Sequence, residues 1–549
     1  MTQRILDFRK NGLRGPKAGR WAVALFFVLL TVLGLWANGG YGLPCDEQWE
    51  QQTLLENAYE YALLLGGENS PAARYYAEKG LTRISESTER DHGQSAYYPL
   101  IPLMNSDLPA NTQMLLWHAY TWLWFMAGVL ALYGIGREMG FSRGVSCMGS
   151  LLLYLCPRFF AEGHYNNKDV VLLCLMLLTL WAGVVFLKKI TLGRGLLLSL
   201  LGALAANTKI VGAMAWGLMG VAAAALLTLR REWNLRKAVT ALVTIFSFVL
   251  FYILLTPAML RDVPAYLSYL LENATGFTRW PGVVLFRDYK YEHAICPLPR
   301  YYLPWMMAVT LPLYVLPLAA VGQITALRDA IRMKSSFWKE TRGLMLGVAT
   351  LCWAVPMGAA ILLRPLIYNG WRHFYFVYAG VAVMGANGLQ VCCARIKKPV
   401  WKRVFTIVLC LCFALSGVGI TQNHPYEYAY YNLLQRGDTA REMELDYWDV
   451  STLNLLEQLA RECGDEDAPL EIGARDDMSQ FGIDHAYTVL SEELQEKLTV
   501  TENPDAPWLF YNTTYARIYE IPAPEGYHEW RTLYSYGQPI CTLWQKDEP

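Results

Sequence analysis

Long runs of apolar residues, each close to the length of a membrane span, recur along the first 420 positions of the chain. A helix that crosses a bilayer needs roughly 20 such residues, because the hydrocarbon core offers backbone groups no other partners. The pattern therefore predicts a polytopic α-helical membrane protein with about eleven transmembrane helices. The predicted spans are residues 21–37, 115–135, 144–157, 169–187, 195–207, 209–229, 238–256, 301–324, 343–363, 374–391 and 404–420.

The first apolar run, Trp21 to Ala37, has two possible readings. A basic stretch precedes it, as in a secretory signal peptide; the basic residues are Arg4, Arg9, Lys10, Arg14, Lys17 and Arg20. No small-x-small cleavage motif follows the run, and many further apolar runs do. We therefore interpret it as a retained membrane anchor.

Three longer polar segments separate or follow the spans, at residues 38–114, 257–300 and 421–549. The last is too polar to span and long enough to fold by itself. Its apolar spacing predicts a helix at 451–462 and strands at 470–473, 508–512, 532–536 and 540–544, with a hairpin at Gly537. The chain thus divides into a membrane domain, residues 1–420, and a small α/β domain, residues 421–549.

Composition and charge sharpen this picture. Hydrophobic residues make up 54% and charged residues 17%, which excludes an ordinary soluble protein. The net charge is zero, which argues against a nucleic-acid partner. Yet residues 421–549 carry 25 acids and 8 bases, so the first 420 residues are strongly basic.

The basic residues lie in alternate short loops, as the positive-inside rule describes for cytoplasmic loops. These loops are residues 137–143, 188–194, 230–237, 328–342 and 395–403. We therefore expect a multi-pass protein of the plasma membrane whose N-terminus is cytoplasmic and whose C-terminal domain is extracytoplasmic. Segment 38–114 is then the first extracytoplasmic loop.

The first candidate for chemistry is the acid pair Asp46-Glu47, just past the first span. Acids this close to lipid are costly and are usually functional or paired. An ionised carboxylate there can take a proton from a hydroxyl or bind a cation. The alternative is a solvated loop that caps the next helix, predicted from Trp49 to Leu64.

A second cluster lies at residues 157–169, a predicted short turn between the third and fourth spans. It holds Arg158, Glu162, His164, Lys168 and Asp169. The alternative is a cluster at a helix end, with Asp169 near a helix start.

A third cluster, Arg364 with residues 369–373, lies between the ninth and tenth spans. Arg372, Lys168, Arg158, Lys209 and Arg364 all fall at outer helix ends, where the positive-inside rule disfavours them. Cations at that depth suit a lipid-borne phosphate. They can equally pair with nearby acids, and the two readings are compatible.

Four cysteines lie outside the spans, namely Cys45, Cys296, Cys463 and Cys541. Disulfides among them are possible in an extracytoplasmic compartment, and the sequence leaves their pairing open.

These clusters together resemble the GT-C superfamily of membrane glycosyltransferases, in particular the bacterial group similar to protein O-mannosyltransferases and to lipid A aminoarabinose transferase. Cys45-Asp46-Glu47 resembles the acidic motif of the family's first loop. Residues 163–169, Gly-His-Tyr-Asn-Asn-Lys-Asp, resemble its Gly-His-x-Asn-Pro-Lys-Asp turn, with Asn167 in place of the usual proline. Further landmarks follow in family order: Leu298-Pro299-Arg300-Tyr301-Tyr302, Gly370-Trp371-Arg372-His373-Phe374, His424-Pro425-Tyr426 and Asp446-Tyr447-Trp448.

The resemblance implies an inverting glycosyltransferase that moves a sugar from a polyprenyl-phosphate donor to an acceptor hydroxyl at the outer face of the membrane. The acceptor would be a glycan, a lipid or a protein. The implied catalytic residues are Asp46, the general base, and Glu47. Residues implied to bind the donor phosphate are Arg372, Lys168, Arg158 and His373.

Some relatives use a divalent metal and others do not, so the resemblance leaves metal dependence open. His164 and Asp169 are candidates for a metal ligand or a second acid, with Glu47 as a further ligand.

Two other classes of function remain as alternatives. A transporter or flippase of a phosphorylated lipid explains the spans and the cations equally well, although not large outer loops beside an acid pair. A non-catalytic cell-surface assembly protein would place its function in the C-terminal domain.

Overall fold

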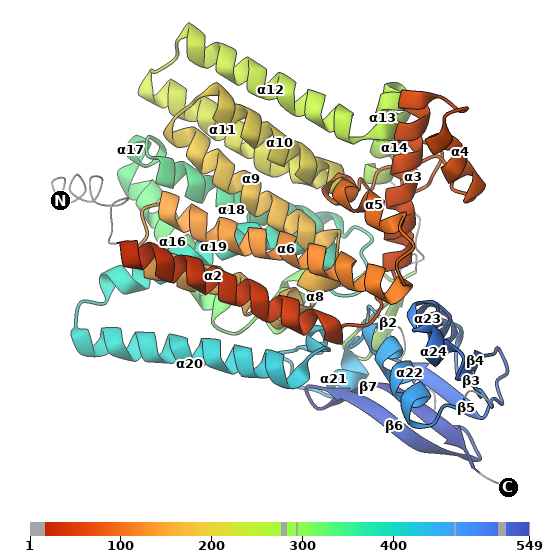
Figure 1. Ribbon diagram of the computed structural model, residues 1–549. Coiled ribbons are helices and arrows are strands. Elements are labelled where there is room, and N and C mark those ends of the chain that lie inside the picture. Colours follow the sequence, from red (N-terminus) through yellow and green to blue (C-terminus); the bar gives the residue numbers. More distant parts are fainter. Residues whose placement is uncertain (1–16, 276–282, 293–294, 466–467, 514–522, 548–549) are drawn as a thin grey trace.

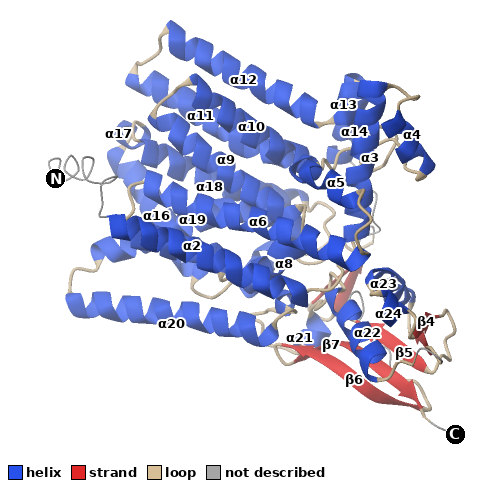
Figure 2. Ribbon diagram, viewed as in Figure 1, coloured by secondary structure: helices blue, strands red, loops and turns tan. Residues whose placement is uncertain are grey.

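The computed structural model describes residues 17–275, 283–292, 295–465, 468–513 and 523–547. The N-terminal basic residues Arg4, Arg9, Lys10 and Arg14 lie outside this part of the chain. A bundle of long helices fills most of the molecule, and a small domain with a β-sheet packs at one end of it (Figures 1 and 2).

The bundle is built from apolar helices of membrane-spanning length. Among the described residues, eight such helices occur, or ten if each of two bent helix pairs counts as one span. The eight are α2 (Lys17–Ala37), α6 (Ala110–Glu138), α9 (Asp169–Lys188), α11 (Ala213–Arg230), α12 (Leu235–Leu255), α18 (Thr341–Leu363), α19 (Tyr378–Arg395) and α20 (Pro399–Asn423). The prediction of a polytopic helical membrane protein is confirmed.

The two bent pairs and one shorter helix account for the other predicted spans. The pairs are α7 (Arg143–Tyr154) with α8 (Pro157–Tyr165), bent by 71°, and α15 (Tyr302–Thr310) with α16 (Val315–Met333), bent by 117°. The run predicted at 195–207 is α10 (Leu192–Thr208), which is shorter than the other spans.

The bend between α7 and α8 corrects the expectation of a short turn at residues 157–169. Residues 157–165 are helical, and only Asn166 to Lys168 form the turn. Pro157 starts the new helix, where its missing N–H costs nothing, and it disfavours helix at the preceding residue. The bend directs α8 into the interior, and all nine of its residues are buried.

Glycines let the central helices α16 and α19 approach closely. A Cβ at Gly322 would lie 1.9 Å from the Met384 carbonyl oxygen, and one at Gly388 would lie 1.9 Å from that of Leu318. Small residues at a crossing allow backbones to touch, which is how membrane helices gain packing energy without a hydrophobic driving force. This crossing supports α19, and the short helix η4 (Arg372–Val377) that carries part of the site leads directly into α19.

The helices of the first loop and those of residues 257–275 form a layer over one end of the bundle (Figure 1). The first loop contains α3 (Glu47–Gly66), α4 (Pro71–Glu78) and α5 (Ile101–Met104). The helix predicted from Trp49 to Leu64 is therefore confirmed as part of α3. The 257–300 segment contains α13 (Pro257–Arg261), α14 (Val263–Thr275) and an antiparallel hairpin of β1 (Val283–Phe286) and β2 (Tyr289–Glu292), which the sequence analysis did not predict.

The C-terminal domain contains a five-stranded mixed sheet in the order β4-β3-β5-β7-β6. Its strands are β3 (Leu470–Ala474), β4 (Leu498–Val500), β5 (Trp508–Asn512), β6 (Tyr527–Ser535) and β7 (Gln538–Lys546), and its helices are α21 (Thr439–Glu442), α22 (Val450–Glu462), α23 (Asp477–Val489) and α24 (Glu492–Gln495). β3 runs parallel to β4 and β5, whereas β7 pairs antiparallel with β5 and β6. The helix and the four strands predicted from the sequence are all present. The turn of the predicted hairpin lies at Tyr536 and Gly537, both with positive φ.

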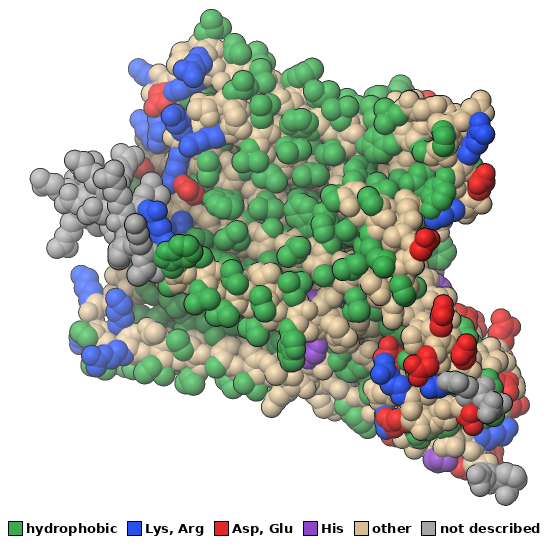
Figure 3. All heavy atoms as spheres, viewed as in Figure 1, with side chains coloured by type: hydrophobic (Ala, Val, Ile, Leu, Met, Phe, Trp, Pro, Cys, Tyr) green, Lys and Arg blue, Asp and Glu red, His purple; other side chains and the backbone are tan. Residues whose placement is uncertain are grey.

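Charge is segregated along the bundle. Lys and Arg side chains gather at the end that carries the α11–α12 and α19–α20 loops, whereas acidic side chains are frequent on the C-terminal domain at the opposite end (Figure 3). All twelve cysteines, including the four considered for disulfides, are free thiols.

Candidate active site

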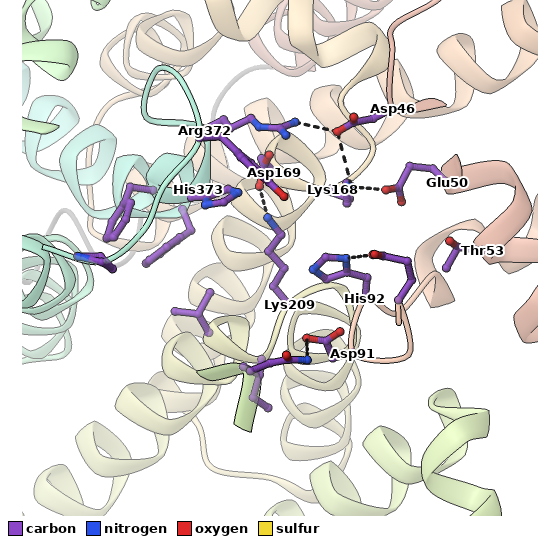
Figure 4. A pocket seen from close by; sticks show the side chains of 18 of the residues that line it. Asp46, Glu50, Thr53, Asp91, His92, Lys168, Asp169, Lys209, Arg372 and His373 are labelled. Carbon is purple, nitrogen blue, oxygen red and sulfur yellow. Dashed lines mark hydrogen bonds and ion pairs between the residues drawn. The ribbon is translucent and has the colours of Figure 1, made fainter. Parts of the chain in front are cut away.

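A cavity of about 900 Å³ is lined by residues from the starts of α3 and α9, from η4 and from the end of α18. Its lining combines charged side chains from four separate elements with an apolar wall (Figure 4). The polar part includes Asp46, Glu50, Lys168, Asp169, Lys209, Arg372 and His373. The apolar part includes Pro356, Ala359, Ala360 and Leu363 of α18 and the following Pro365.

Asp46 lies at the N-cap position of α3, but its side chain does not cap that helix. Its carboxylate accepts a hydrogen bond from Arg372 Nη1 at 3.0 Å, and Lys168 Nζ lies 3.8 Å from the same oxygen. The reading of Asp46 as a helix-capping residue is therefore not supported. The structure instead places it at the junction of the three sequence clusters.

Glu50 is a second acid in this network that the sequence analysis did not single out. It forms an ion pair with Lys168 and accepts hydrogen bonds from Gln94 and, at 3.3 Å, from Asn167 Nδ2. It lies four residues after Asp46, so both acids project from the same side of α3. That spacing is the signal in the sequence that would have found it.

The balance of burial and charge favours the ionised forms of Asp46 and Lys168. Burial alone would raise the pKa of Asp46, but the attraction of Arg372 and Lys168 outweighs it and lowers the pKa below its usual value. Burial alone would lower the pKa of the Lys168 ammonium, but Glu50 and Asp46 outweigh it and hold that pKa well above its usual value.

Arg372 is held in an aromatic cage. Its guanidinium carbon lies 4.6 Å from the ring centres of Tyr368 and Tyr447 and 4.5 Å from that of Trp448. Nη2 donates a hydrogen bond to the Tyr447 hydroxyl at 2.7 Å. Such contacts stabilise a desolvated guanidinium in a fixed orientation.

A second ion pair lines the same cavity. Lys209 Nζ contacts Asp169 Oδ1 at 2.5 Å, and Asp169 is the first residue of α9. His373 also lines the cavity, with its ring centre 4.4 Å from that of Tyr368. The structure thus brings Asp46, Lys168, Asp169, Arg372 and His373 together at one cavity.

Three predicted site residues do not line this cavity. Glu47 is fully buried and pairs with His118 Nε2 at 2.6 Å, because it lies about 100° further around α3 than Asp46. His164 contacts the carbonyl oxygens of Phe160 and Gly34 and stacks between aromatic rings in the bundle.

Arg158 is the third of these residues. It is buried in α8, with its guanidinium 4.3 Å from the ring centre of Tyr428 and 4.7 Å from that of Tyr431. These positions give Glu47, His164 and Arg158 packing contacts instead of direct access to a molecule in the cavity.

The suggested metal ligands Glu47, His164 and Asp169 have separate partners. Within the described parts of the chain, no three His, Cys, Asp or Glu side chains form a group that could hold a metal ion. Glu47, His164 and Asp169 therefore do not form a common metal site.

The opposite wall of the cavity carries residues that the sequence analysis missed. His92 Nδ1 contacts Glu89 Oε2 at 2.5 Å, and Asp91 lies beside them in the same loop (Figure 4). These residues fall in the middle of a long polar loop and no short motif marks them, so only the fold reveals that they face the cations.

Comparisons with known proteins found structural similarity only. No protein-family model matches the chain, and neither does any curated protein sequence. Two crystal structures of ArnT from Cupriavidus metallidurans are similar to it, both at 13% sequence identity. The undecaprenyl phosphate-bound form has a TM-score of 0.44 over 95% of this chain and 97% of that chain, and the apo form has 0.45 over 96% and 98%.

The depressed pKa of Asp46 predicts a specific pH dependence of stability. A carboxyl whose pKa is lower in the folded than in the unfolded protein stabilises the fold above its unfolded pKa, near 3.8, and loses that contribution as the pH falls. We expect Asp46→Asn to lower the unfolding temperature at pH 6 to 7, and the difference from wild type to shrink as the pH falls below about 4.

Thermal unfolding of the detergent-solubilised protein between pH 3 and pH 7 measures this. Asp107→Asn, which changes an exposed acid of the same loop, is the control and should track wild type throughout. Parallel curves for Asp46→Asn and wild type at all pH values would contradict the ion-pair assignment.

Proposed function

We propose that the protein is an inverting glycosyltransferase that moves a sugar from a polyprenyl-phosphate donor to an acceptor hydroxyl at the outer face of the membrane. The observation that carries the proposal is a single cavity that holds a fixed carboxylate, Asp46, beside the cations Arg372, Lys168 and Lys209 and against the apolar wall of α18. A lipid phosphate needs cations and an apolar surface together, and an acceptor hydroxyl needs a base.

The donor phosphate would replace Asp46 as the partner of the cations. Arg372 binds phosphate oxygens through its planar fork, and Lys168 adds a point charge. Once Arg372 and Lys168 contact phosphate, the attraction that lowers the pKa of Asp46 is partly neutralised. Asp46 then becomes a stronger base when the donor is bound, which couples donor binding to activation of the acceptor.

The proposed reaction is a single in-line displacement. Asp46 takes the proton from the acceptor hydroxyl, and the oxygen forms a bond to the anomeric carbon. The bond between that carbon and the phosphate oxygen breaks, and the polyprenyl phosphate leaves with the electron pair. Attack from the face opposite the leaving group inverts the anomeric configuration, and Arg372 and Lys168 stabilise the charge that develops on the phosphate.

The acceptor is a glycan, a lipid or a protein, and the wall that carries Glu89, Asp91 and His92 faces the space where it would enter. A flippase remains the main alternative, since it also needs cations for a phosphorylated lipid. It gives no reason for a carboxylate fixed between two of those cations. Mass spectrometry of surface glycans and lipids from a deletion strain would identify the transferred sugar.

Replacing the proposed base tests the reaction itself. Asp46→Asn keeps the side chain's size and removes the proton acceptor, so transfer should fall about 10²–10⁴-fold, the usual contribution of a general base. Turnover of a panel of polyprenyl-phosphate hexoses, pentoses and amino sugars measures this, with Asp107→Asn as the control. Near-wild-type turnover of folded Asp46→Asn would return Asp46 to a purely structural role.

Two substitutions of Arg372 separate phosphate binding from simple charge neutralisation. Lys keeps the charge but cannot reproduce the bidentate fork. We expect donor KM to rise about tenfold for Arg372→Lys and further for Arg372→Ala, because each loses charge-assisted hydrogen bonds. If Arg372 only neutralises Asp46, Lys should substitute well, so an unchanged donor KM in folded protein would rule out the phosphate role.

The proposed orientation in the plasma membrane has a direct test with thiol reagents. The native Cys463 is exposed in the C-terminal domain, and Arg332 is exposed in the last turn of α16 at the opposite end. A membrane-impermeant maleimide added to intact cells should label Cys463 and spare a thiol introduced by Arg332→Cys. The reverse pattern would place the cavity at the cytoplasmic face and contradict the proposal.

A further inference from the structure

We infer that the C-terminal domain is a working part of the proposed site, because its turn Asp446–Asp449, here called the clamp, positions both Asp46 and Arg372. The inference rests on the proposed function only for its kinetic test. The contacts that carry it join the clamp to Cys45, about 400 positions away in the sequence, and to Arg372, 75 positions before Tyr447.

The backbone that leads to Asp46 is fixed by the clamp. Cys45 N–H donates to the Trp448 carbonyl oxygen at 2.8 Å, and Cys45 Sγ lies 3.8 Å from that of Tyr447. Just upstream, a Cβ at Gly42 would lie 2.3 Å from the Val450 carbonyl oxygen, so only glycine allows this approach. Asp46 is therefore held from the side of the C-terminal domain as well as by α3.

The same turn holds Arg372. Two of the three rings that cage its guanidinium, Tyr447 and Trp448, belong to the clamp, and Tyr447 accepts the hydrogen bond from Nη2. Both aromatic side chains are buried. The base and the proposed phosphate ligand thus share one support, which fixes their separation.

The clamp is in turn anchored inside the C-terminal domain. The Asp446 carboxylate accepts hydrogen bonds from the backbone N–H groups of Val450 and Ser451 and from the Ser451 hydroxyl, which ties it to the start of α22. Asn512 Nδ2, at the end of β5, donates to the same carboxylate at 3.0 Å. A series of contacts therefore connects the sheet to Arg372: Asn512 binds Asp446, and Tyr447, the next residue of the turn, binds Arg372.

Asp449 closes the turn in a left-handed conformation, with φ of 60°. Its carboxylate contacts the Thr452 hydroxyl and packs on α23, where a Cβ at Gly482 would lie 2.1 Å from Oδ2. A buried turn held from α22, α23 and β5 is a rigid support, and positioning of reacting groups to within a fraction of an ångström needs one.

The test uses a substitution in β5, away from the cavity lining. Asn512→Leu keeps the side chain's size and removes the amide that holds Asp446. The matched control is Thr532→Val, which removes the hydroxyl pair between Thr532 and Thr542 in the same sheet at 2.9 Å. Asn512→Leu removes the contacts of the amide with Asp446, Ser451 and Thr452, whereas Thr532→Val removes a polar contact of the same sheet that does not involve the clamp.

The native thiol of Cys45 reports the position of the first loop without any assay of transfer. Burial raises the pKa of this thiol well above its usual value, so it should react slowly with N-ethylmaleimide. We expect Asn512→Leu to speed labelling of Cys45 about tenfold, as a decrease of one unit in the thiol pKa would. Peptide-resolved mass spectrometry distinguishes Cys45 from the exposed Cys410 and Cys463.

The outcomes separate the inference from the proposed function. Faster Cys45 labelling in Asn512→Leu but not in Thr532→Val supports the clamp even if no sugar transfer is detected. Equal labelling in the two variants, both folded, overturns it. If Asn512→Leu does not fold, Trp448→Leu against Trp448→Phe replaces it, and faster Cys45 labelling in the Leu variant alone supports the clamp, whereas equal rates overturn it.

Steady-state kinetics provide a second test, of the positioning role of Tyr447. Tyr447→Phe keeps the ring and removes only the hydroxyl that Arg372 contacts, so donor KM should rise about tenfold while kcat and the unfolding temperature change little. A lower unfolding temperature with unchanged KM would show that Tyr447 only stabilises the fold and would overturn its positioning role.

Discussion

A guanidinium ion removed from water is stable only where other groups replace the hydration that it loses. Arg372 is 4% exposed, and the site is organised around meeting that requirement. Its partners come from Asp46 of the first loop, Tyr368 after α18 and the turn at Tyr447 in the C-terminal domain. One buried charge thereby ties three distant parts of the chain together.

The same constraint explains why the cavity's charges occur in pairs. Lys168 contacts Glu50 and Asp46, and Lys209 contacts Asp169, so each of these cations has a carboxylate within contact distance. Such ion pairs are stable when no ligand is bound. A phosphate can also replace the carboxylates as partner of the cations, because it offers them equivalent oxygens. The network therefore suits both a stable fold and a donor site.

Helix geometry decides which of the polar residues reach this network. The bend at Pro157 points α8 into the bundle, so Arg158 and His164 are surrounded by aromatic side chains away from the cavity. Asp46 and Glu50 lie on one side of α3 and face the cations, whereas Glu47 lies about 100° around the helix from Asp46 and contacts His118. Adjacent acids in the sequence thus have different environments.

The sequence by itself determined the helical membrane architecture, the sheet-containing C-terminal domain and the three clusters that supply Asp46, Lys168 and Arg372. The length of an apolar run, the alternation of apolar residues in a strand and a charge next to a predicted span are local features of the sequence. They can therefore be recognised without knowledge of the fold. Only the tertiary structure decided that Glu50 and His92 join the cavity, that Glu47, Arg158 and His164 do not, and that Tyr447 and Trp448 cage Arg372. Those outcomes depend on helix rotation, on one sharp bend and on contacts between residues far apart in the sequence, and no local pattern encodes them.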